Sequence, residues 1–265
     1  MELASARHAF VTGGASGIGL AVADALAARG LCVTIADARD DLIAAALAAR
    51  GDGFRGAVLD VRDRQGWERA RAEAEAAFGP VDVLVNNAGI APDGLELADM
   101  PPESFDRVLA INLGGVFNGI ATFGAALRER GRGHVVNTAS MSGMVMDGPG
   151  VGSYGAAKAG LIAISEVLRM EMAPHGVGVS VLCPSFVATD LMANTLRMGG
   201  QLRDPSLSLR AAPMQPAEAA AMVVRAIEDD RFWIFTHPER RAAVEERHRG
   251  ILAGFDAMGP LGKLA

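Results

Sequence analysis

The residues best placed to do chemistry are Tyr154, which is the only tyrosine in the chain, and Lys158, four positions later. Leu161, Ile164 and Leu168 follow at helical spacing, so the two side chains share one helix face. An ammonium group that close to a phenol favours the phenolate and lowers the phenol pKa from its usual value near ~10. Such a phenol can serve as a general acid or base. An ordinary exposed helix would show the same spacing, so the rest of the chain has to decide.

A glycine-rich turn near the N-terminus predicts a phosphate site. The apolar run 8–12 is followed by Gly-Gly-Ala-Ser-Gly-Ile-Gly over 13–19, and then by a helical pattern that stops at Gly30. A strand, a glycine turn and a helix present backbone N–H groups and a helix N-terminus to a phosphate. A simple turn between two elements is the alternative reading, and the position between a strand and a helix favours the phosphate.

The next apolar run, 31–36, ends at Asp37, eighteen residues beyond Gly19. A carboxylate at this place can accept hydrogen bonds from both hydroxyls of an adenosine ribose. It also repels a 2′-phosphate, so NAD is favoured over NADP. Arg39 points the other way, because a nearby arginine can pair with that phosphate. Asp37 could also cap the following helix, a role compatible with ribose binding.

The rest of the chain predicts an α/β fold with a parallel sheet. Helical patterns cover 41–50, 64–78, 102–130, 216–229 and 239–249, and strand patterns cover 54–59, 81–85, 134–140, 177–183 and 232–235. Such alternation implies βαβ crossovers, with ligands at the carboxyl ends of the strands. Asp60 and the Asn-Asn-Ala-Gly turn over 86–89 occupy such ends. A length of 265 residues without a linker suits one domain.

Composition excludes several other classes of protein. Twenty-five basic residues against 31 acidic ones give a net charge of −6, which argues against nucleic acid or an anionic membrane as partner. No signal segment and no apolar run near ~18 residues is evident, so we expect a soluble, cytoplasmic protein. Cys32 and Cys183 lie in strands too far apart to bridge, and both are expected to be reduced thiols. The five histidines show no metal-ligand spacing, so no metal is expected.

Together these motifs resemble the short-chain dehydrogenase/reductase family. The resemblance rests on Thr-Gly-x3-Gly-x-Gly over 12–19, Asp60, Asn-Asn-Ala-Gly over 86–89, Asn112, Ser140, Tyr154 with Lys158, and a segment from Pro184 to Thr189. It implies a single doubly wound Rossmann-like domain over residues 1–265. The sheet would hold seven mainly parallel strands in the order 3-2-1-4-5-6-7.

The resemblance also implies a cofactor site for NAD, with NADP less favoured. Its residues would be Gly13, Ser16, Gly17, Ile18, Gly19, Asp37, Asp60, Val61, Asn87, Ala88, Gly89, Tyr154, Lys158, Pro184, Val187 and Thr189. Asp60 and Val61 would contact the adenine, and Thr189 would bind the nicotinamide carboxamide.

The implied catalytic set is Asn112, Ser140, Tyr154 and Lys158, acting on a small-molecule secondary alcohol or ketone by hydride transfer. Tyr154 would exchange the proton, Ser140 would hold the substrate oxygen, and Lys158 would lower the tyrosine pKa and bind the nicotinamide ribose. Asn112 would hold a water that links Lys158 to solvent, although a hydrogen-bonded core asparagine fits the pattern equally well. Ser142 is the alternative to Ser140, since it points the same way in an extended chain.

Two further features concern the substrate and the assembly. Residues 189–213 are expected to form a substrate lid rich in leucine and methionine, with a hinge at Gly199-Gly200, which favours an apolar or aryl-bearing substrate. The same side chains could instead pack the lid or a subunit contact. Ser185 replaces the glycine usual in the family. The resemblance implies a homodimer or homotetramer, and leaves an epimerase, dehydratase or enoyl reductase, or a non-catalytic nucleotide-binding module, as alternatives.

Overall fold

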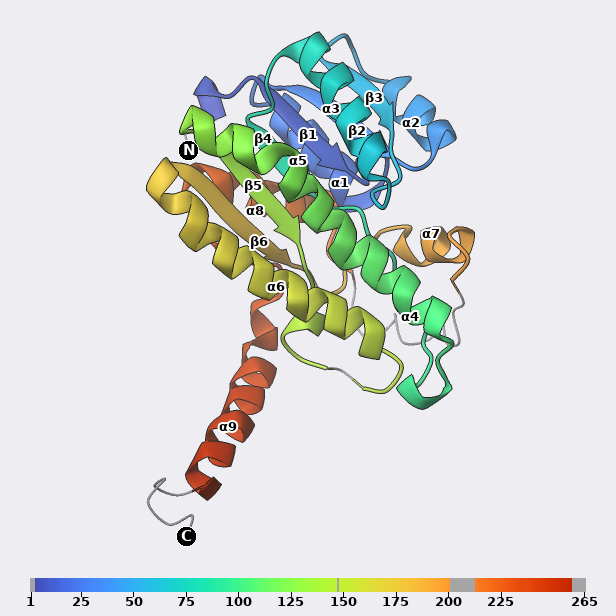
Figure 1. Ribbon diagram of the computed structural model, residues 1–265, viewed down its shortest axis with the longest axis vertical. Helices are drawn as coiled ribbons and strands as arrows, with labels where there is room; N and C mark the ends of the chain where they lie inside the picture. The colour runs from blue at the N-terminus through green and yellow to red at the C-terminus, as the bar shows by residue number, and fades with distance from the viewer. Residues whose placement is uncertain (1–2, 147, 201–212, 259–265) are drawn as a thin grey trace.

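A computed structural model describes residues 3–146, 148–200 and 213–258. Within these ranges, the strands form one sheet of seven, ordered β3-β2-β1-β4-β5-β6-β7 (Figure 1). The strands are β1 (His8–Thr12), β2 (Cys32–Asp37), β3 (Phe54–Val58), β4 (Val83–Asn86), β5 (Gly133–Thr138), β6 (Val177–Cys183) and β7 (Trp233–Phe235). The predicted order is confirmed. Each neighbouring pair is parallel, so all carboxyl ends lie at one edge of the sheet.

Helices cover both faces of this sheet. They are α1 (Gly17–Ala27), α2 (Asp40–Leu47), α3 (Arg64–Phe78), α4 (Pro102–Leu109), α5 (Gly115–Arg130), α6 (Gly152–Met172), α7 (Leu191–Arg197), α8 (Pro216–Glu228) and α9 (Arg241–Met258). Side chains of α1, α2 and α8 form one apolar cluster with the sheet, and those of α3, α5 and α6 form another on the opposite face. Figure 1 shows α9 projecting away from the body, and none of its residues is buried.

The central strands β1, β4 and β5 are buried along their whole length because both faces of the sheet are covered. In β1, Ala9 and Val11 pack into the cluster around α1 and α8, whereas Phe10 packs into the cluster on the other side. This alternation follows from the two-residue period of a strand. Phe10 contacts the ring of buried Trp67, whose indole N–H donates to the Val61 carbonyl. The packing therefore fixes the end of the loop that carries Asp60 and Val61.

The long helix expected over 102–130 is not a continuous α-helix. A π-helical turn, Ala110–Gly114, separates α4 from α5, and Asn112 lies within it. Such a turn inserts one extra residue and occurs frequently at functional sites. By length and composition alone, Pro102–Arg130 could cross a membrane, although the sequence shows no apolar run of that length. Of its apolar window, 56% is buried inside the protein. A core helix passes the same test, and this one packs against α3, α6 and the sheet.

Part of the expected lid is helical, and the two ends of the lid segment are hydrogen-bonded to each other. The segment leaves β6 through Phe186 and Ala188 and includes α7. Met214, at the other end, donates its N–H to the Phe186 carbonyl (3.0 Å) and accepts from the Ala188 N–H (2.9 Å). These two bonds close the neck of the segment. The expected lid residues Leu202, Leu207 and Leu209 lie outside the described residues.

Candidate active site

The turn between β1 and α1 is shaped for close approach of a ligand to the backbone. Gly13 and Gly17 have φ angles of +58° and +55°, which side chains disfavour. A Cβ at Gly13 would also lie 2.9 Å from the Ala88 Cα, so only glycine at this position lets the turn pack this closely against the chain after β4. The turn and the N-terminus of α1 line a cavity at the carboxyl edge of the sheet. Backbone N–H groups at a helix start favour an anion there.

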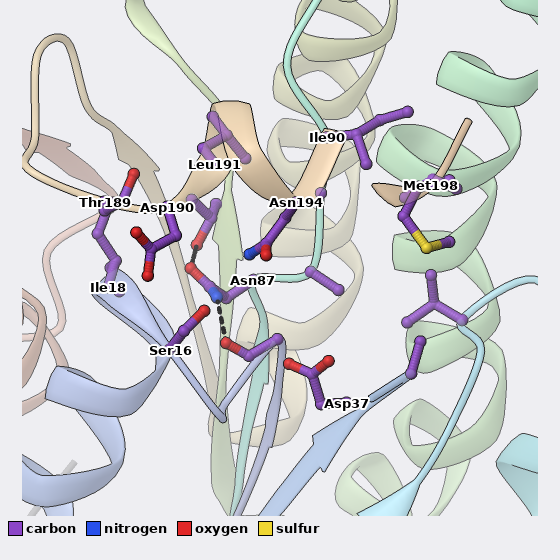
Figure 2. A pocket seen from close by; sticks show the side chains of 18 of the residues that line it. Ser16, Ile18, Asp37, Asn87, Ile90, Thr189, Asp190, Leu191, Asn194 and Met198 are labelled. Atoms are coloured by element: carbon purple, nitrogen blue, oxygen red, sulfur yellow. Dashed lines mark hydrogen bonds between the residues drawn. The ribbon is translucent and has the colours of Figure 1, made fainter. Parts of the chain in front are cut away.

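Asn87 fixes the chain after β4 against this turn. Its side-chain amide donates to the Thr12 carbonyl (3.1 Å) and the Gly13 carbonyl (3.3 Å), and its carbonyl accepts from the Thr138 hydroxyl (3.3 Å). The Thr12 hydroxyl in turn accepts from the Asn87 N–H (2.9 Å). Figure 2 shows Asn87 on the floor of the cavity between these partners. The carboxyl ends of β1, β4 and β5 are therefore held together beneath the cavity.

Asp37 ends β2 and presents a carboxylate to the same cavity. Burial raises its pKa above the ordinary value, while N–H groups of Arg39, Ala15 and Ala38 oppose that rise. The Arg39 guanidinium instead pairs with Asp41, with Nε donating to its carboxylate at 2.8 Å. Among the described contacts, no cationic side chain forms an ion pair with Asp37. Its carboxylate can therefore accept hydrogen bonds from hydroxyl groups of a ligand.

Tyr154, Ser140 and Lys158 come together at the other end of the cavity. Tyr154 and Lys158 belong to the first turns of α6 and both line the cavity, with the Lys158 Nζ 5.6 Å from the tyrosine ring centre. The Ser140 side chain interacts with the Tyr154 hydroxyl and favours its phenolate form, while the Ser140 Oγ donates to the Pro184 carbonyl (3.4 Å). Ser142 has a different role: its backbone N–H donates to the Ser140 Oγ (3.1 Å) and so orients that hydroxyl. The structure thus places Ser140, not Ser142, beside the phenol.

The expected lowering of the tyrosine pKa is wrong for the protein alone. Burial raises the Tyr154 pKa, and the interaction with Ser140 only partly offsets the rise. Burial also lowers the pKa of Lys158 to about 8, so a smaller fraction of this side chain carries a positive charge than for an exposed lysine. Its Nζ donates to the Thr138 carbonyl (2.8 Å), which holds it beneath the cavity. The sequence argument treated both groups as solvated, and burial reverses it.

Asn112 takes the role of a paired core amide. Its Oδ1 accepts from the Ile90 N–H (2.8 Å) and its Nδ2 donates to the Ile90 carbonyl (2.9 Å), and the side chain is fully buried. Between it and Lys158 lies Gly89, where an added Cβ would come within 2.8 Å of the Asn112 Oδ1 and 3.6 Å of the Lys158 Nζ. The π turn therefore aims an amide oxygen at the space beside the lysine.

A helix that the sequence did not predict lies over the cavity. Residues of α7 and its flanks that line it are Asp190, Leu191, Asn194, Arg197 and Met198 (Figure 2). Thr195, the next residue along α7, is buried; it accepts a hydrogen bond from the Ala91 N–H (2.7 Å) and donates to the Leu191 carbonyl (2.8 Å). The segment that receives it is joined to α4 by an ion pair between buried Asp93 and Arg107. This docking holds α7 over the cavity.

Most of the expected cofactor residues meet in this one cavity. The lining includes Gly13, Ser16, Gly17, Ile18, Asp37, Asp60, Val61, Asn87, Ala88, Gly89, Tyr154, Lys158, Pro184 and Thr189. Gly19, Val187, Asn112 and Ser140 do not line it. Asp60 is turned to Arg62, whose Nη2 lies 2.6 Å from its carboxylate. Within residues 3–146, 148–200 and 213–258, no group of three or more histidine, cysteine or acidic side chains is placed to hold a metal.

Comparison with known proteins identifies the family. The family model described as short chain dehydrogenase matches residues 7–199, well over half of the chain. The chain belongs to the short-chain dehydrogenase family. The C alpha-dehydrogenase of Sphingobium sp. is 32% identical, covering 96% of this chain and 87% of that protein. The 1-deoxy-11-beta-hydroxypentalenate dehydrogenase of Streptomyces exfoliatus is 35% identical, covering 91% and 86%. The probable oxidoreductase EphD of Mycobacterium tuberculosis is 42% identical over 70% of this chain, which spans only 32% of that protein.

Two solved structures share the architecture over nearly the whole chain. A Burkholderia phymatum short chain dehydrogenase/reductase in complex with NAD superposes with a TM-score of 0.88 at 29% identity, covering 96% of this chain and 97% of that one. The apo form of LigO from Sphingobium sp. gives 0.83 at 30% identity, covering 99% and 93%. The family and the fold expected from the motifs are therefore confirmed.

Sequence reasoning missed a set of residues that line the cavity of this short-chain dehydrogenase. They are Ala38, Leu42, Leu59, Ile90, Ile111, Thr138, Ala139, Asp190, Asn194 and Arg197. Those that follow a strand could have been found, because ligands lie beyond the carboxyl ends of parallel strands. The α7 residues gave no such signal, since their place depends on how the segment folds back over the sheet.

Proposed function

We propose that this chain is an NAD-dependent oxidoreductase that interconverts a secondary alcohol and a ketone on an apolar or aryl-bearing small molecule. One observation carries the proposal: the Tyr154 hydroxyl, interacting with Ser140 and backed by Lys158, opens onto the same cavity as the glycine turn and Asp37. A proton-transfer group and a dinucleotide-shaped cleft therefore share one space.

The residues fit a dinucleotide. The glycine turn and the start of α1 suit a pyrophosphate, Asp37 suits an adenosine ribose, Thr189 lies against Gly17 of the turn, and Lys158 lies beside Tyr154. Support for NAD rather than NADP comes from the half-buried Asp37 carboxylate; Arg39 also lines the cavity, but its guanidinium is paired with Asp41. The NAD-bound Burkholderia phymatum relative is consistent with this choice.

The protein contributes orientation and proton transfer, while a bound nicotinamide supplies or accepts the hydride. Ser140 donates to the substrate oxygen and holds it near Tyr154. In the reduction direction, the neutral phenol donates its proton to the ketone oxygen as hydride reaches the carbonyl carbon. In oxidation, Tyr154 must first lose its proton, and the ammonium of Lys158 stabilises the phenolate. The raised pKa of Tyr154 leaves it protonated near neutral pH, which suits the reductive direction.

The substrate class is argued from exposed apolar side chains near the start of α6 and after β6. Leu97, Met146 and Phe186 are exposed by 64%, 45% and 37%, and they come from three separate loops. Met146 contacts Gly155, next to Tyr154, and Leu97 contacts Gly152 at the start of α6. Phe186 follows the Pro184 that lines the cavity. Exposed apolar side chains gathered beside a reactive group favour an apolar ligand.

Spectrophotometry at the NADH absorption band tests the proposal. The purified protein is assayed with NAD⁺ and NADP⁺ across aryl, alkyl and polyol secondary alcohols, and with NADH across the matching ketones. We expect turnover of aryl or alkyl substrates with NAD(H), and its loss in Tyr154→Phe while NADH binding is retained. Preference for polyols would overturn the substrate class, preference for NADP⁺ the cofactor, and NADH binding without any turnover the activity.

A further inference from the structure

The cavity-facing side of α7 carries polar groups that the glycine turn alone does not explain. Asn194 and Arg197 both line the cavity, one helical turn apart. Figure 2 shows the Asn194 side chain pointing from α7 into the cavity toward Asn87, which is bonded to the glycine turn. The helix thus brings polar side chains to the side of the cavity opposite the backbone N–H groups of the turn.

The orientation of the Asn194 amide is fixed by its neighbour. Arg197 Nη1 donates to Asn194 Oδ1 at 3.1 Å. A guanidinium can only donate, so the amide oxygen must face Arg197, and the amide nitrogen faces away from it. Both N–H bonds of that nitrogen are then available as donors. Such an arrangement suits an acceptor-rich ligand and not a donor.

The charges around the cavity leave one region suited to an anion. Asp37 lies at the end of β2, and Asp190 precedes α7 close to Ile18 and Thr189 (Figure 2). Both carboxylates disfavour an anion beside them. The Arg39 guanidinium also lines the cavity, next to Asp37, and is paired with Asp41. Arg197 is the cation that α7 adds to the cavity, and it is hydrogen-bonded to Asn194.

We propose that Asn194 and Arg197 form an anion subsite on α7 that binds the cofactor pyrophosphate from the side opposite the glycine turn. The inference rests on the proposed cofactor and names further residues for it. The turn supplies backbone N–H groups from below, and α7 supplies an amide and a guanidinium from above. The pyrophosphate is thereby held between the sheet edge and the covering helix, which couples cofactor binding to the position of α7.

The test compares ADP-ribose, which contains the pyrophosphate but no nicotinamide, with adenosine, which lacks the pyrophosphate. Dissociation constants for NADH are measured by fluorescence, and those of the two fragments by competition. Asn194→Asp keeps the size and the acceptor for Arg197 but replaces the donors by a carboxylate. Arg197→Gln removes the charge. Leu196→Ala, at a side chain on α7 that is 52% exposed and does not line the cavity, is the control.

Loss of a hydrogen bond to a charged group corresponds to about a ten- to hundredfold change in affinity. We expect ADP-ribose and NADH to bind more weakly by about that factor in Asn194→Asp and Arg197→Gln, with Leu196→Ala unchanged and adenosine changed less than twofold. Circular dichroism checks that the variants are folded. Unchanged ADP-ribose affinity, or an equal loss for adenosine, would overturn the subsite. A wild-type protein that binds neither NADH nor ADP-ribose would refute the proposed function itself.

Discussion

Thr195 offers a direct test of whether α7 controls access to the cavity. Its hydroxyl is buried and accepts from the Ala91 N–H at 2.7 Å, across 104 residues of sequence. Thr195→Val keeps the branched shape and nearly the same helix propensity but removes the acceptor. With α7 docked, the Ala91 N–H is then buried without a partner, whereas in an undocked state water can bind it.

The expected magnitude follows from that difference. A buried donor without a partner costs about 1–3 kcal/mol, and the cost applies to the docked state alone. The ratio of docked to undocked α7 should therefore fall about 5- to 150-fold. If the cofactor leaves only when α7 lifts, its dissociation rate should rise by a comparable factor.

Stopped-flow fluorescence measures this rate, with NADH-loaded protein mixed against excess ADP-ribose. Thr195→Ser, which keeps the hydroxyl and loses only a methyl group, is the matched control and should remain close to wild type. Thermal unfolding is followed alongside, because the same lost bond lowers overall stability if α7 does not move. A valine variant that melts earlier but releases NADH at the wild-type rate would refute the reasoning, as would equal acceleration in the serine variant.

Three further predictions concern the groups around the phenol. Burial lowers the pKa of Lys158 to about 8, so between that pH and about 10.5 the folded chain binds fewer protons than the unfolded chain. The free energy of unfolding should therefore rise with pH across that window. Lys158→Met should abolish this rise in thermal melts recorded without cofactor between about pH 8 and 9.5. Gly89→Ala places a Cβ 2.8 Å from the Asn112 Oδ1, and we expect at least a tenfold loss of kcat, whereas Gly53→Ala, which meets nothing within 4 Å, should match wild type. Ser140→Ala should lower kcat about 100-fold with little change in NADH affinity, and an equal effect from Ser142→Ala would contradict the assignment of Ser140.

The fold was accessible from the sequence because its determinants are local. Buried parallel strands read as short apolar runs, and the bounds of β1, β6 and α3 match the patterns that predicted them. Apart from the π turn and α7, the errors fall at element ends: α2 stops at Leu47 and not at residue 50, and α9 reaches Met258 and not residue 249. Helix ends depend on capping and tertiary contacts, which a hydrophobic pattern does not contain.

The site was less accessible, and the reasons are physical. The glycine turn and Asp37 follow from chain geometry, so their place at the cavity could be predicted. The tyrosine pKa could not, because spacing shows the neighbouring lysine but not the burial that outweighs it. Asn194 lines the cavity, whereas the neighbouring Thr195 binds the loop after β4, and neither belongs to a pattern that the sequence displays. Their positions depend on the docking of α7 against the loop after β4.

The π turn at Ala110–Gly114 has a consequence for how this helix tolerates change. One residue advances an α-helix by about 100°, so the extra residue sets the outward face of α5 out of phase with that of α4. Deleting one residue there would restore a regular ladder and swing the Asn112 amide about a quarter turn from Ile90 and Gly89. Loss of one residue from an exposed loop would not rotate this helix, whereas loss of one residue from the π turn would misorient the Asn112 amide.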